Sequence, residues 1–480
     1  MTLTKRSLVT IDDLSNGEIE ALFSLADEMS DSMDEQFGVC RGKVMASLFF
    51  EPSTRTRLSF ETAMHRLGGS VISVADARAT SLAKGESIAD MARVVGSYAN
   101  IIVIRHPWEG AARVVADYAG IPVINAGDGG HEHPTQTLCD LYTIKKERQT
   151  IKGLRIALWG DLKHGRTIHS LAYALAKFGA TIHFRSGPGL ELPDYVKRKL
   201  TAEYTGRLER YDDVTGTGKG RLFPLDAIYI TPSEPHQLAN IPAVSMQIEL
   251  KTGIDALYVT RLQRERLSPT DKEQELKEDY PVVDKKLLKE KEFEKTLVMH
   301  PLPRVDELAY EVDADPRSMY FKQAVRGVPI RMALIASLLG TRELSVPEKD
   351  NPFIRKVDYP VYRRGFGVRC TNPGCVSTQE SEARYIKPEF KIVDYRPLTL
   401  RCVYCEHEVH PPYIASSDWH EGKLESKKYH GAGSQWARRI KTENLLIFDS
   451  EAEAEAHGFK PGHYIGQRHQ DNGKRAGQRE

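Results

Sequence analysis

The chain has 480 residues, enough for about three domains, and 40% of its residues are hydrophobic, which suffices for soluble cores. Its formal net charge of +1 creates no overall field that would attract nucleic acid or an anionic membrane. The first residues contain no apolar segment like that of an export signal, and no apolar run is long enough to cross a bilayer. We therefore expect a cytoplasmic protein with no membrane partner.

The first informative segment lies between a predicted strand and a predicted helix. The apolar run 44–50 predicts a buried strand, and the apolar spacing within 60–67 predicts a helix. Three hydroxyl groups and one guanidinium group occupy the turn between them, from Ser53, Thr54, Thr56 and Arg55. Free N–H groups and the positive end of the helix dipole make such a turn a site for phosphate, and Arg55 adds a planar fork of donors. Taken alone, the segment is more typical of an ordinary N-cap, so this interpretation depends on the rest of the chain.

Short apolar strands alternate with helices up to about Leu339. Strands are predicted at 101–104, 123–124 and 155–159, and a break at 152–153 separates two successive units. This alternation predicts an α/β fold with two doubly wound parallel-sheet domains. In such sheets ligands bind at the carboxyl ends of the strands and between domains.

Polar clusters follow the predicted strands in six further places. They occupy residues 81–86, 105–107, 133–136, 160–167, 260–263 and 300–304. Each cluster is weak evidence alone, because an arginine is usually a surface residue and a His-Pro pair usually just starts a helix. Six of them at strand ends in one chain are very improbable by chance.

These segments resemble the aspartate carbamoyltransferases. The matching motifs are S-T-R-T at 53–56, H-P-T-Q-T at 133–137, G-D-L-K-x-G-R-T at 160–167, T-R-x-Q at 260–263 and H-P-L-P-R at 300–304. The resemblance covers roughly residues 5–344. It implies transfer of a carbamoyl group from carbamoyl phosphate to L-aspartate, giving N-carbamoyl-L-aspartate and phosphate in pyrimidine (UMP) biosynthesis. It also implies a carbamoyl-phosphate domain at 1–149, an aspartate domain at 150–324, and a C-terminal helix at 325–345 that packs back on the first domain.

The resemblance also assigns a role to each polar residue. It places carbamoyl phosphate against Ser53, Thr54, Arg55, Thr56, Ser81, Lys84, Arg105, His133 and Gln136. The catalytic residues are Arg55, Thr56, Arg105 and His133; the last three donate to the carbonyl oxygen as it becomes an oxyanion. Aspartate is assigned to Lys84, Arg166, Arg261, Gln263, Pro301 and Leu302. Two arginines suit this dicarboxylate, because each can bind one carboxylate with two hydrogen bonds.

The loop that carries Ser81 and Lys84 has a separate implication. In the family the corresponding loop reaches into the active site of the neighbouring subunit. The match implies a homotrimer, or a higher homo-oligomer built from trimers, with shared active sites. The alternative is a solvated basic loop.

The nearest alternative within the fold is a carbamoyltransferase for ornithine or another amine. Ornithine carries a side-chain ammonium group that needs an acidic partner, and that family has Cys in an H-C-L-P segment where this chain has Pro301. Arg261 and Gln263 suit a carboxylate instead. The alternative from a different class is a zinc-ribbon protein that binds nucleic acid and keeps an inactive enzyme fold. The intact set of substrate arginines argues against it, so we expect no nucleic-acid partner.

Four of the cysteines lie close together in the sequence, in the pairs Cys370/Cys375 and Cys402/Cys405. In a chain without an export signal, this clustering favours a metal site over disulfides. Two tight turns separated by a short β-rich segment bring four thiolates into a tetrahedron. So small a module has little core, and the metal supplies folding free energy. We expect one structural zinc ion per chain and no catalytic cofactor.

The cysteine segments resemble the zinc domain of the bacterial aspartate carbamoyltransferase regulatory chain. The polypeptide is therefore interpreted as a catalytic–regulatory fusion, with a linker at 346–368, a β-rich zinc domain at 369–415 and a tail of unknown role at 416–480. In that family a nucleotide-binding domain precedes the zinc domain, yet the linker is too short to hold one. We therefore expect CTP and ATP to have little effect on the enzyme.

Overall fold

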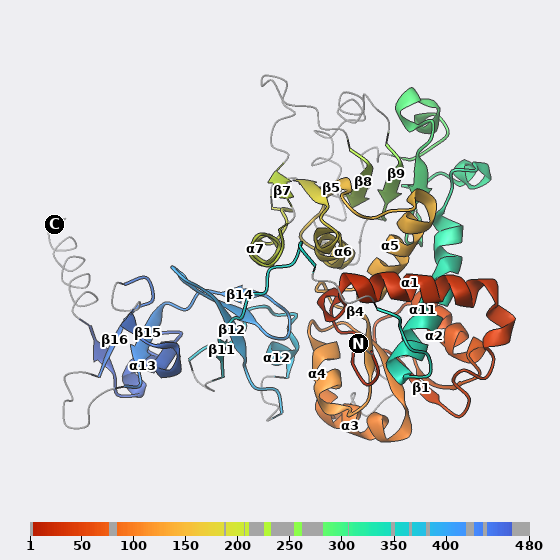
Figure 1. Ribbon diagram of the computed structural model, residues 1–480. Helices are drawn as coiled ribbons and strands as arrows, with labels where there is room; N and C mark the ends of the chain where they lie inside the picture. Colours follow the sequence, from red (N-terminus) through yellow and green to blue (C-terminus); the bar gives the residue numbers. More distant parts are fainter. Residues whose placement is uncertain are drawn as a thin grey trace. The chain divides into compact units, whose positions relative to one another are not determined.

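The computed structural model describes residues 3–75, 84–186, 189–205, 207–210, 225–231, 254–261, 282–305, 307–346, 351–363, 367–380, 385–418, 427–434 and 439–462. These residues form two compact units. The larger consists of Met1–Pro107 and Val115–Lys356, and the smaller of Trp108–Val114 and Val357–Glu480. Figure 1 shows the elements of both units coloured along the sequence. Among the described helices, none has the length and apolar composition needed to span a membrane.

The first sheet of the larger unit is parallel, with the strand order β2-β1-β3-β4. Its strands are β1 (Val44–Phe49), β2 (Ser70–Val74), β3 (Ile101–His106) and β4 (Val123–Asp128). Strands β3 and β4 are buried along their whole length, which explains why they read as continuous apolar runs. The helices of this part are α1 (Asn16–Asp31), α2 (Thr54–Arg66), α3 (Ile88–Tyr98), α5 (Pro134–Arg148) and the second half of α4 (Ala111–Tyr118), whose first half is grouped with the smaller unit. We call this part of the unit the N-terminal domain.

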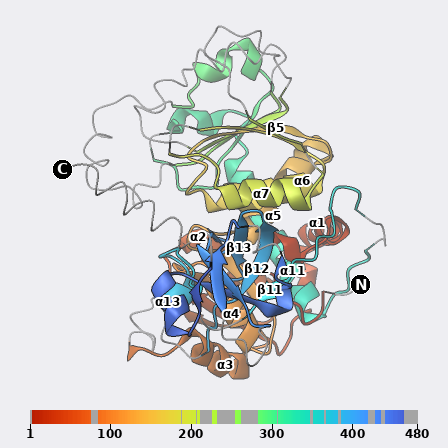
Figure 2. The same ribbon diagram turned by 90° about the vertical axis from the view of Figure 1, so that its left-hand side faces the viewer.

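The second sheet is also parallel, with the order β10-β9-β8-β5-β6-β7. Its strands are β5 (Arg155–Gly160), β6 (Thr181–Arg185), β7 (Arg207–Arg210), β8 (Ala227–Thr231), β9 (Ala256–Val259) and β10 (Leu297–Met299). Helices α6 (Arg166–Lys177) and α7 (Asp194–Glu203) run along one side of it (Figure 2). We call this part the middle domain. The prediction of two doubly wound parallel sheets is therefore confirmed.

Both sheets have a point where the strand order reverses. In the N-terminal domain the chain leaves β1 toward β2 on one side and later adds β3 on the other. In the middle domain it leaves β5 toward β6 and later adds β8 on the opposite side. Loops that leave such a pair of strands diverge, and they open a crevice at the carboxyl ends. The predicted ligand motifs follow β1, β3 and β5, so the topology itself brings them to these two crevices.

Helix α11 (Tyr320–Leu339) carries the chain from the middle domain back to the N-terminal domain, where it packs against α1, α2 and α5. It begins at Tyr320, earlier than the predicted residue 325. Tyr320 is fully buried in the core of the middle domain, and this packing stabilises an extra first turn.

A second connection between the domains comes from Asp12, whose carboxylate accepts from Lys177 Nζ at 2.9 Å and Lys199 Nζ at 2.7 Å. The described 3-10 helices of the unit are η1 (Ile11–Asp13), η2 (Met33–Gln36), η6 (Leu287–Lys289), η7 (Lys291–Phe293) and η8 (Tyr310–Ala314).

The predicted linker is partly docked on the larger unit. Residues 351–355 lie against the end of α7, where the Thr205 N–H donates to the Phe353 carbonyl at 2.9 Å and the Arg355 N–H to Glu203 at 2.8 Å. The Phe353 ring lies beside Gly179, whose positive φ of 72° ends α6 and whose missing side chain leaves room for the ring. The first described part of the linker is thus held by hydrogen bonds and packing.

The smaller unit contains two further sheets. The first is antiparallel, ordered β11-β12-β13-β14, and consists of β11 (Val361–Tyr362), β12 (Phe390–Tyr395), β13 (Leu398–Cys402) and β14 (Glu408–Val409), with the short helix α12 (Val376–Gln379). The central pair, β12 and β13, is the sheet that the apolar residues between the cysteine pairs predicted. The early segment Trp108–Val114 belongs to this unit, because the Glu109 N–H donates to the Gly374 carbonyl at 2.8 Å and the Val376 N–H to the Glu109 carbonyl at 2.9 Å.

The second sheet of the smaller unit uses residues that the sequence assigned to a tail. Its strands are β15 (Tyr413–Ser416), β16 (Lys428–Gly431), β17 (Leu445–Phe448) and β18 (Lys460–Pro461), in the order β17-β15-β16-β18, with α13 (Glu451–Ala456) and η11 (Thr442–Asn444). The suggested boundary at residue 416 therefore falls within β15. The sheet has a small core in which Tyr429 and Phe448 are fully buried. The polar residues 463–480 lie outside the described residues.

Candidate active site

The carboxyl ends of both sheets in the larger unit face one cavity of about 440 Å³. Eleven of the predicted site residues line it: Ser53, Thr54, Arg55, Thr56, Arg105, His133, Gln136, Arg166, Arg261, Pro301 and Leu302. They come from loops that are distant in sequence and from both domains. The cavity is therefore a composite site, in which neither domain alone supplies the full set of groups.

The N-terminus of α2 forms one wall of this cavity. Ser53 occupies the N-cap position, but its hydroxyl group makes no capping hydrogen bond to the helix. The simple N-cap interpretation of the sequence is therefore not what the structure shows, and this hydroxyl remains available to a ligand. Arg55 Nη2 donates to the Leu302 carbonyl at 2.5 Å, which connects α2 to a loop of the middle domain. Burial, and secondarily the nearby charge of Arg261, lowers the pKa of Arg55. Such a concentration of positive charge at a helix N-terminus favours a polyanion.

Glu51 organises the two arginines at the centre of the cavity. Arg105 Nη2 donates to Glu51 Oε1 at 2.6 Å, and Arg166 donates to both carboxylate oxygens, at 2.9 and 3.0 Å. Burial would raise the pKa of Glu51, but hydrogen bonds and charge from Arg166 and then Arg105 outweigh it and lower that pKa to about 2. Sequence reasoning gave Glu51 no role, although an acidic residue at a strand end, directly before a cationic motif, was the available signal.

His133 lies buried at the N-cap of α5. Its backbone N–H donates to Ser170 Oγ at 2.9 Å, so α6 of the middle domain helps to fix its position. Burial lowers the pKa of His133 far below its ordinary value, and the charges of Arg105, Arg166 and Arg331 lower it further. The imidazole is therefore neutral near pH 7 and carries one N–H donor. A neutral donor beside a cationic one suits an oxygen that gains negative charge during a reaction.

The loop after β10 closes the cavity on the side of the middle domain. His300 fixes this loop: its Nδ1 accepts from the Leu302 N–H at 2.8 Å, and its Nε2 bonds Glu307 Oε1 at 2.8 Å. Leu302 has a positive φ of 53°, a conformation that this hydrogen bond supports. The segment thus places its backbone carbonyls at the cavity in a defined geometry. Arg166, at the start of α6, and Arg261, just after β9, line the same side.

Three predicted site residues are not found in this cavity. Ser81 and Gln263 lie outside the described residues. Lys84 is described and exposed, and it does not line the cavity of its own chain. Conversely, Tyr229, Thr231, Gln323 and Arg331 line the cavity although sequence reasoning did not identify them. Arg331 stands out among these residues because its guanidinium is buried and stacks on the Phe60 ring at 5.0 Å.

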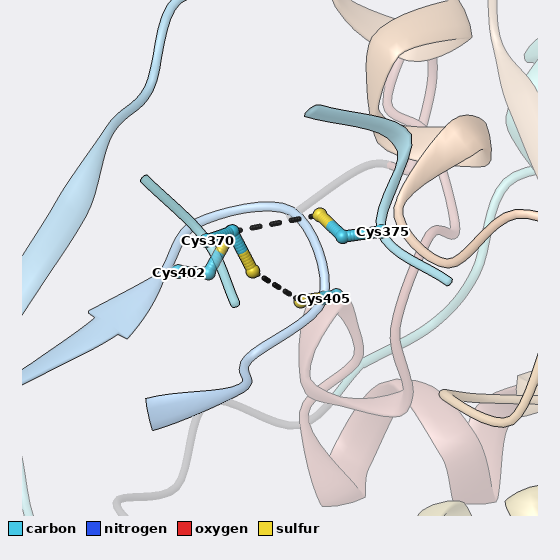
Figure 3. A group of neighbouring side chains, drawn as sticks. All are labelled: Cys370, Cys375, Cys402 and Cys405. Carbon is cyan, nitrogen blue, oxygen red and sulfur yellow. Dashed lines mark hydrogen bonds between the residues drawn. The ribbon is translucent and has the colours of Figure 1, made fainter. Parts of the chain in front are cut away.

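The smaller unit holds the predicted metal centre. The sulfur atoms of Cys370, Cys375, Cys402 and Cys405 lie within 4.8 Å of one another, and all four residues are buried (Figure 3). Two of the S–S distances are 3.5 and 3.9 Å. Four thiolates around a tetrahedral zinc ion lie about 3.8 Å apart. The donor set and its spacing therefore fit zinc, and Ser377 Oγ, 3.1 Å from Cys375 Sγ, is a hydrogen-bond partner for one ligand.

Comparisons with known proteins agree with these two sites. Residues 6–146 match the family described as "Aspartate/ornithine carbamoyltransferase, carbamoyl-P binding domain", and residues 235–338 match its "Asp/Orn binding domain". The aspartate carbamoyltransferase catalytic subunit of Thermoplasma acidophilum is 46% identical over 340 residues, which cover 70% of this chain and 99% of that protein. The chain belongs to the aspartate carbamoyltransferase family. The corresponding subunit of Clostridium botulinum is 44% identical over 341 residues, 71% of this chain and 100% of that protein.

Solved structures give the same result. The catalytic subunit from M. jannaschii is 39% identical with a TM-score of 0.55, covering 70% of this chain and 98% of that one. The Trypanosoma cruzi enzyme with N-(phosphonacetyl)-L-aspartic acid is 34% identical with a TM-score of 0.56, covering 70% and 97%. Residues 364–414 match the "Aspartate carbamoyltransferase regulatory chain, metal binding domain". The chain is thus a fusion of a catalytic region with the metal-binding domain of a regulatory chain.

The Glu51 ion pairs predict a pH dependence of stability. Because the folded-state pKa lies below the ordinary value, the pairs stabilise the fold above about pH 4.5 and are lost as the pH falls toward 2. Between about pH 5 and pH 3, wild type should therefore lose roughly 2 kcal/mol more stability than Glu51→Gln, measured from urea denaturation midpoints. Glu443→Gln, which changes an exposed carboxylate, should show the same change in the free energy of unfolding with pH as wild type. If the free energy of unfolding changes equally with pH in wild type and in Glu51→Gln, this account is contradicted.

Proposed function

We propose that this cavity transfers the carbamoyl group of carbamoyl phosphate to the amino group of L-aspartate, giving N-carbamoyl-L-aspartate and phosphate. The observation that carries the proposal is the convergence in one cavity of an anion site on α2, a neutral imidazole and two further arginines. A solved relative from Trypanosoma cruzi, 35% identical over 70% of this chain, contains carbamoyl phosphate and aspartate together. In this proposal the chain supplies the first committed step of pyrimidine biosynthesis.

The proposed mechanism begins with carbamoyl phosphate on α2. Its phosphate accepts from the first-turn N–H groups, including that of Thr56, from the Ser53 and Thr54 hydroxyls, and from Arg55. The carbonyl oxygen then faces the donors of Thr56, Arg105 and His133. The aspartate amine attacks the carbonyl carbon, the C=O electrons move to the oxygen as an oxyanion, and the C–O bond to phosphate breaks as the carbonyl re-forms. The amine proton leaves with the phosphate. Positioning and oxyanion stabilisation account for catalysis without a covalent intermediate.

The second substrate follows from the charges of the cavity. We assign the two carboxylates of aspartate to Arg166 and Arg261, supported by Gln263, Lys84 and the Pro301–Leu302 backbone. Among the described residues that line the cavity, Glu51 is the only acid, and it is already paired with Arg105 and Arg166. An ornithine ammonium group would find no further carboxylate there. The described lining therefore favours an anionic second substrate over a cationic one.

Replacement of Arg55 tests the proposed reaction. Arg55→Ala removes a guanidinium group that, in the proposed mechanism, binds the phosphate of carbamoyl phosphate. We therefore expect kcat to fall by at least about a hundredfold with little change in the thermal denaturation temperature. The measurement is release of phosphate from carbamoyl phosphate in the presence of L-aspartate. Arg41→Ala, at an exposed site, should behave like wild type. Absence of turnover by the wild-type chain, with L-ornithine active instead, would reverse the assignment of substrate.

We further propose that the chain forms a homotrimer whose active sites are shared between subunits. Lys84 does not reach the cavity of its own chain, although the family resemblance assigns it to both substrates. Strand β2 is an edge of the first sheet and exposes Ile72 (43%), and helix α3, which follows β2 in the chain, exposes Tyr98 (66%). An exposed apolar edge strand is a site that a neighbouring subunit typically covers. A trimer would bury this edge and bring each Lys84 to a neighbouring cavity.

Subunit hybrids test the shared site. Lys84→Ala and Arg55→Ala chains should each be nearly inactive. When the two are mixed and reassembled, some cavities combine Arg55 of one chain with Lys84 of its neighbour, so activity should return to about a quarter of wild type for random trimers. Sedimentation should show trimers throughout. If each chain contains its complete site, mixing restores no activity.

For the metal centre we propose one structural zinc ion per chain. Cys402→Ser should abolish stoichiometric zinc binding and lower the thermal denaturation temperature of the smaller unit, because ligand binding there supplies folding free energy. Zinc content and differential scanning calorimetry measure both effects. Cys40→Ala, a buried thiol of the larger unit, should leave the zinc content unchanged. A Cys402→Ser chain with full zinc content would contradict the assignment.

We also propose a cytoplasmic location and the division of the chain into a carbamoyl-phosphate domain, an aspartate domain and, as the third, a metal-binding domain. None of the six cysteines, all of which are described, forms a disulfide, and this is typical of a reducing compartment.

A further inference from the structure

Asp140 lies at the centre of a buried network behind the cavity. It is fully buried on α5, four residues after Gln136. Its Oδ1 atom accepts three hydrogen bonds, from Gln136 Nε2 at 2.8 Å, Gln323 Nε2 at 2.7 Å and the Tyr258 hydroxyl at 3.0 Å. These donors come from α5, α11 and β9, and therefore from both domains of the larger unit.

The network fixes which way the Gln136 amide faces. Oδ1 already receives the Gln323 and Tyr258 donors and is therefore an acceptor, and any proton on the carboxyl group lies on Oδ2, so the NH₂ group of Gln136 must point toward Asp140 Oδ1. The amide carbonyl is then the end that remains for the cavity, which Gln136 lines. A carbonyl at this position recognises a donor on the ligand, and the carbamoyl NH₂ is such a donor. An ester or acetyl group has none.

The same carboxylate also reaches the loop that closes the cavity. Gln323 uses its Nε2 atom for Asp140 and its Oε1 atom to accept from the His300 N–H at 3.2 Å. His300 in turn holds the Leu302 N–H at 2.8 Å. One hydrogen-bonded path therefore runs from Gln136 through Asp140 and Gln323 to the backbone of the substrate loop. The stacked pair Tyr258 and Tyr229, with ring centroids 4.3 Å apart, supports the third donor.

We propose that Asp140 is a positioning residue that holds the Gln136 amide with its carbonyl toward the substrate, and that it thereby selects a carbamoyl over an acetyl group on the phosphate. The inference rests on the proposed function, because it concerns the substrate of that reaction. Acetyl phosphate has the same phosphate and carbonyl but a methyl group in place of the NH₂. In the intact network it leaves the fixed carbonyl of Gln136 without a donor, which disfavours acetyl phosphate at least about tenfold. Without Asp140, the Gln136 amide could rotate, and the cavity would no longer distinguish carbamoyl phosphate from acetyl phosphate.

Two substitutions at Asp140 distinguish the effect of its hydrogen-bond acceptor from the effect of its negative charge. Burial raises the pKa of Asp140 to about 7, against the lowering effect of its three donors and of Arg331. Asp140→Asn keeps an oxygen where Oδ1 stands and places its NH₂ where Oδ2 has no hydrogen-bond partner. It should therefore keep the Gln136 orientation. Asp140→Ala removes the acceptor and frees the amide.

The decisive measurement is the ratio of kcat/KM for carbamoyl phosphate to that for acetyl phosphate, with L-aspartate as the acceptor. We expect Asp140→Ala to lower this ratio at least about tenfold and Asp140→Asn to keep it within about threefold of wild type. Thr143→Val is the matched control, because Thr143 is equally buried on α5 and bonds only the Cys139 carbonyl among the described contacts. A purely structural role for Asp140 would lower stability or kcat while leaving the ratio unchanged.

A double-mutant cycle with Gln136→Ala shows whether Asp140 acts through Gln136. In the Gln136→Ala background, Asp140→Ala should change the ratio no further, whereas independent effects would add. If Asp140→Ala does not fold, Asp140→Leu removes the same acceptor while filling its space and should lower the ratio in the same way. An unchanged ratio in Asp140→Ala, with an active wild type, overturns the inference alone. A wild type without turnover on carbamoyl phosphate overturns the proposed function instead.

Discussion

The ion pairs of Glu51 with Arg105 and Arg166 set the geometry on which the rest of the cavity depends. Glu51 and Arg105 leave the first sheet, whereas Arg166 starts a helix of the second, so one carboxylate joins both domains at the point where a ligand must lie. Two buried guanidinium groups without a counter-ion would repel each other and pay a large desolvation cost. Glu51 neutralises part of that charge while leaving the cavity positive. An anionic ligand that competes for these arginines would therefore alter the connection between the domains as it binds.

The parallel sheets determine where such a network can form. Each sheet reverses its strand order once, and the loops that leave the reversed strands carry the motifs: Glu51 to Thr56 after β1, Arg105 at the end of β3 and Arg166 after β5. Helix α11 then returns to the N-terminal domain, and its residues Gln323 and Arg331 line the cavity. The residues that line the cavity thus lie largely at helix N-termini and strand ends, which are among the more rigid positions available.

Much of this arrangement could be predicted from the sequence, because its signals are local. The strand–turn–helix around Arg55 is encoded within 44–67, and each cysteine pair lies within one short turn. Both features can therefore be recognised from one sequence. The partners of Glu51 lie 54 and 115 residues away, and those of Asp140 include a residue 183 positions later. No local pattern records such pairings. The sheet formed by β15 to β18 was missed for a different reason: its strands are only two to four residues long, too short for a clear alternation.

The docking of residues 351–355 beside α7 changes how the fused metal-binding domain relates to its catalytic region. Because Phe353 and Arg355 are hydrogen-bonded to 203–205, the connection between the two units begins only after that point. A short connection keeps the two parts at an effective concentration on the order of millimolar, whatever the protein concentration in the cell. Two parts held together only by noncovalent contacts separate on dilution by mass action. In this chain the ratio of the two parts is fixed at one by the peptide bond, and mass action no longer controls their association.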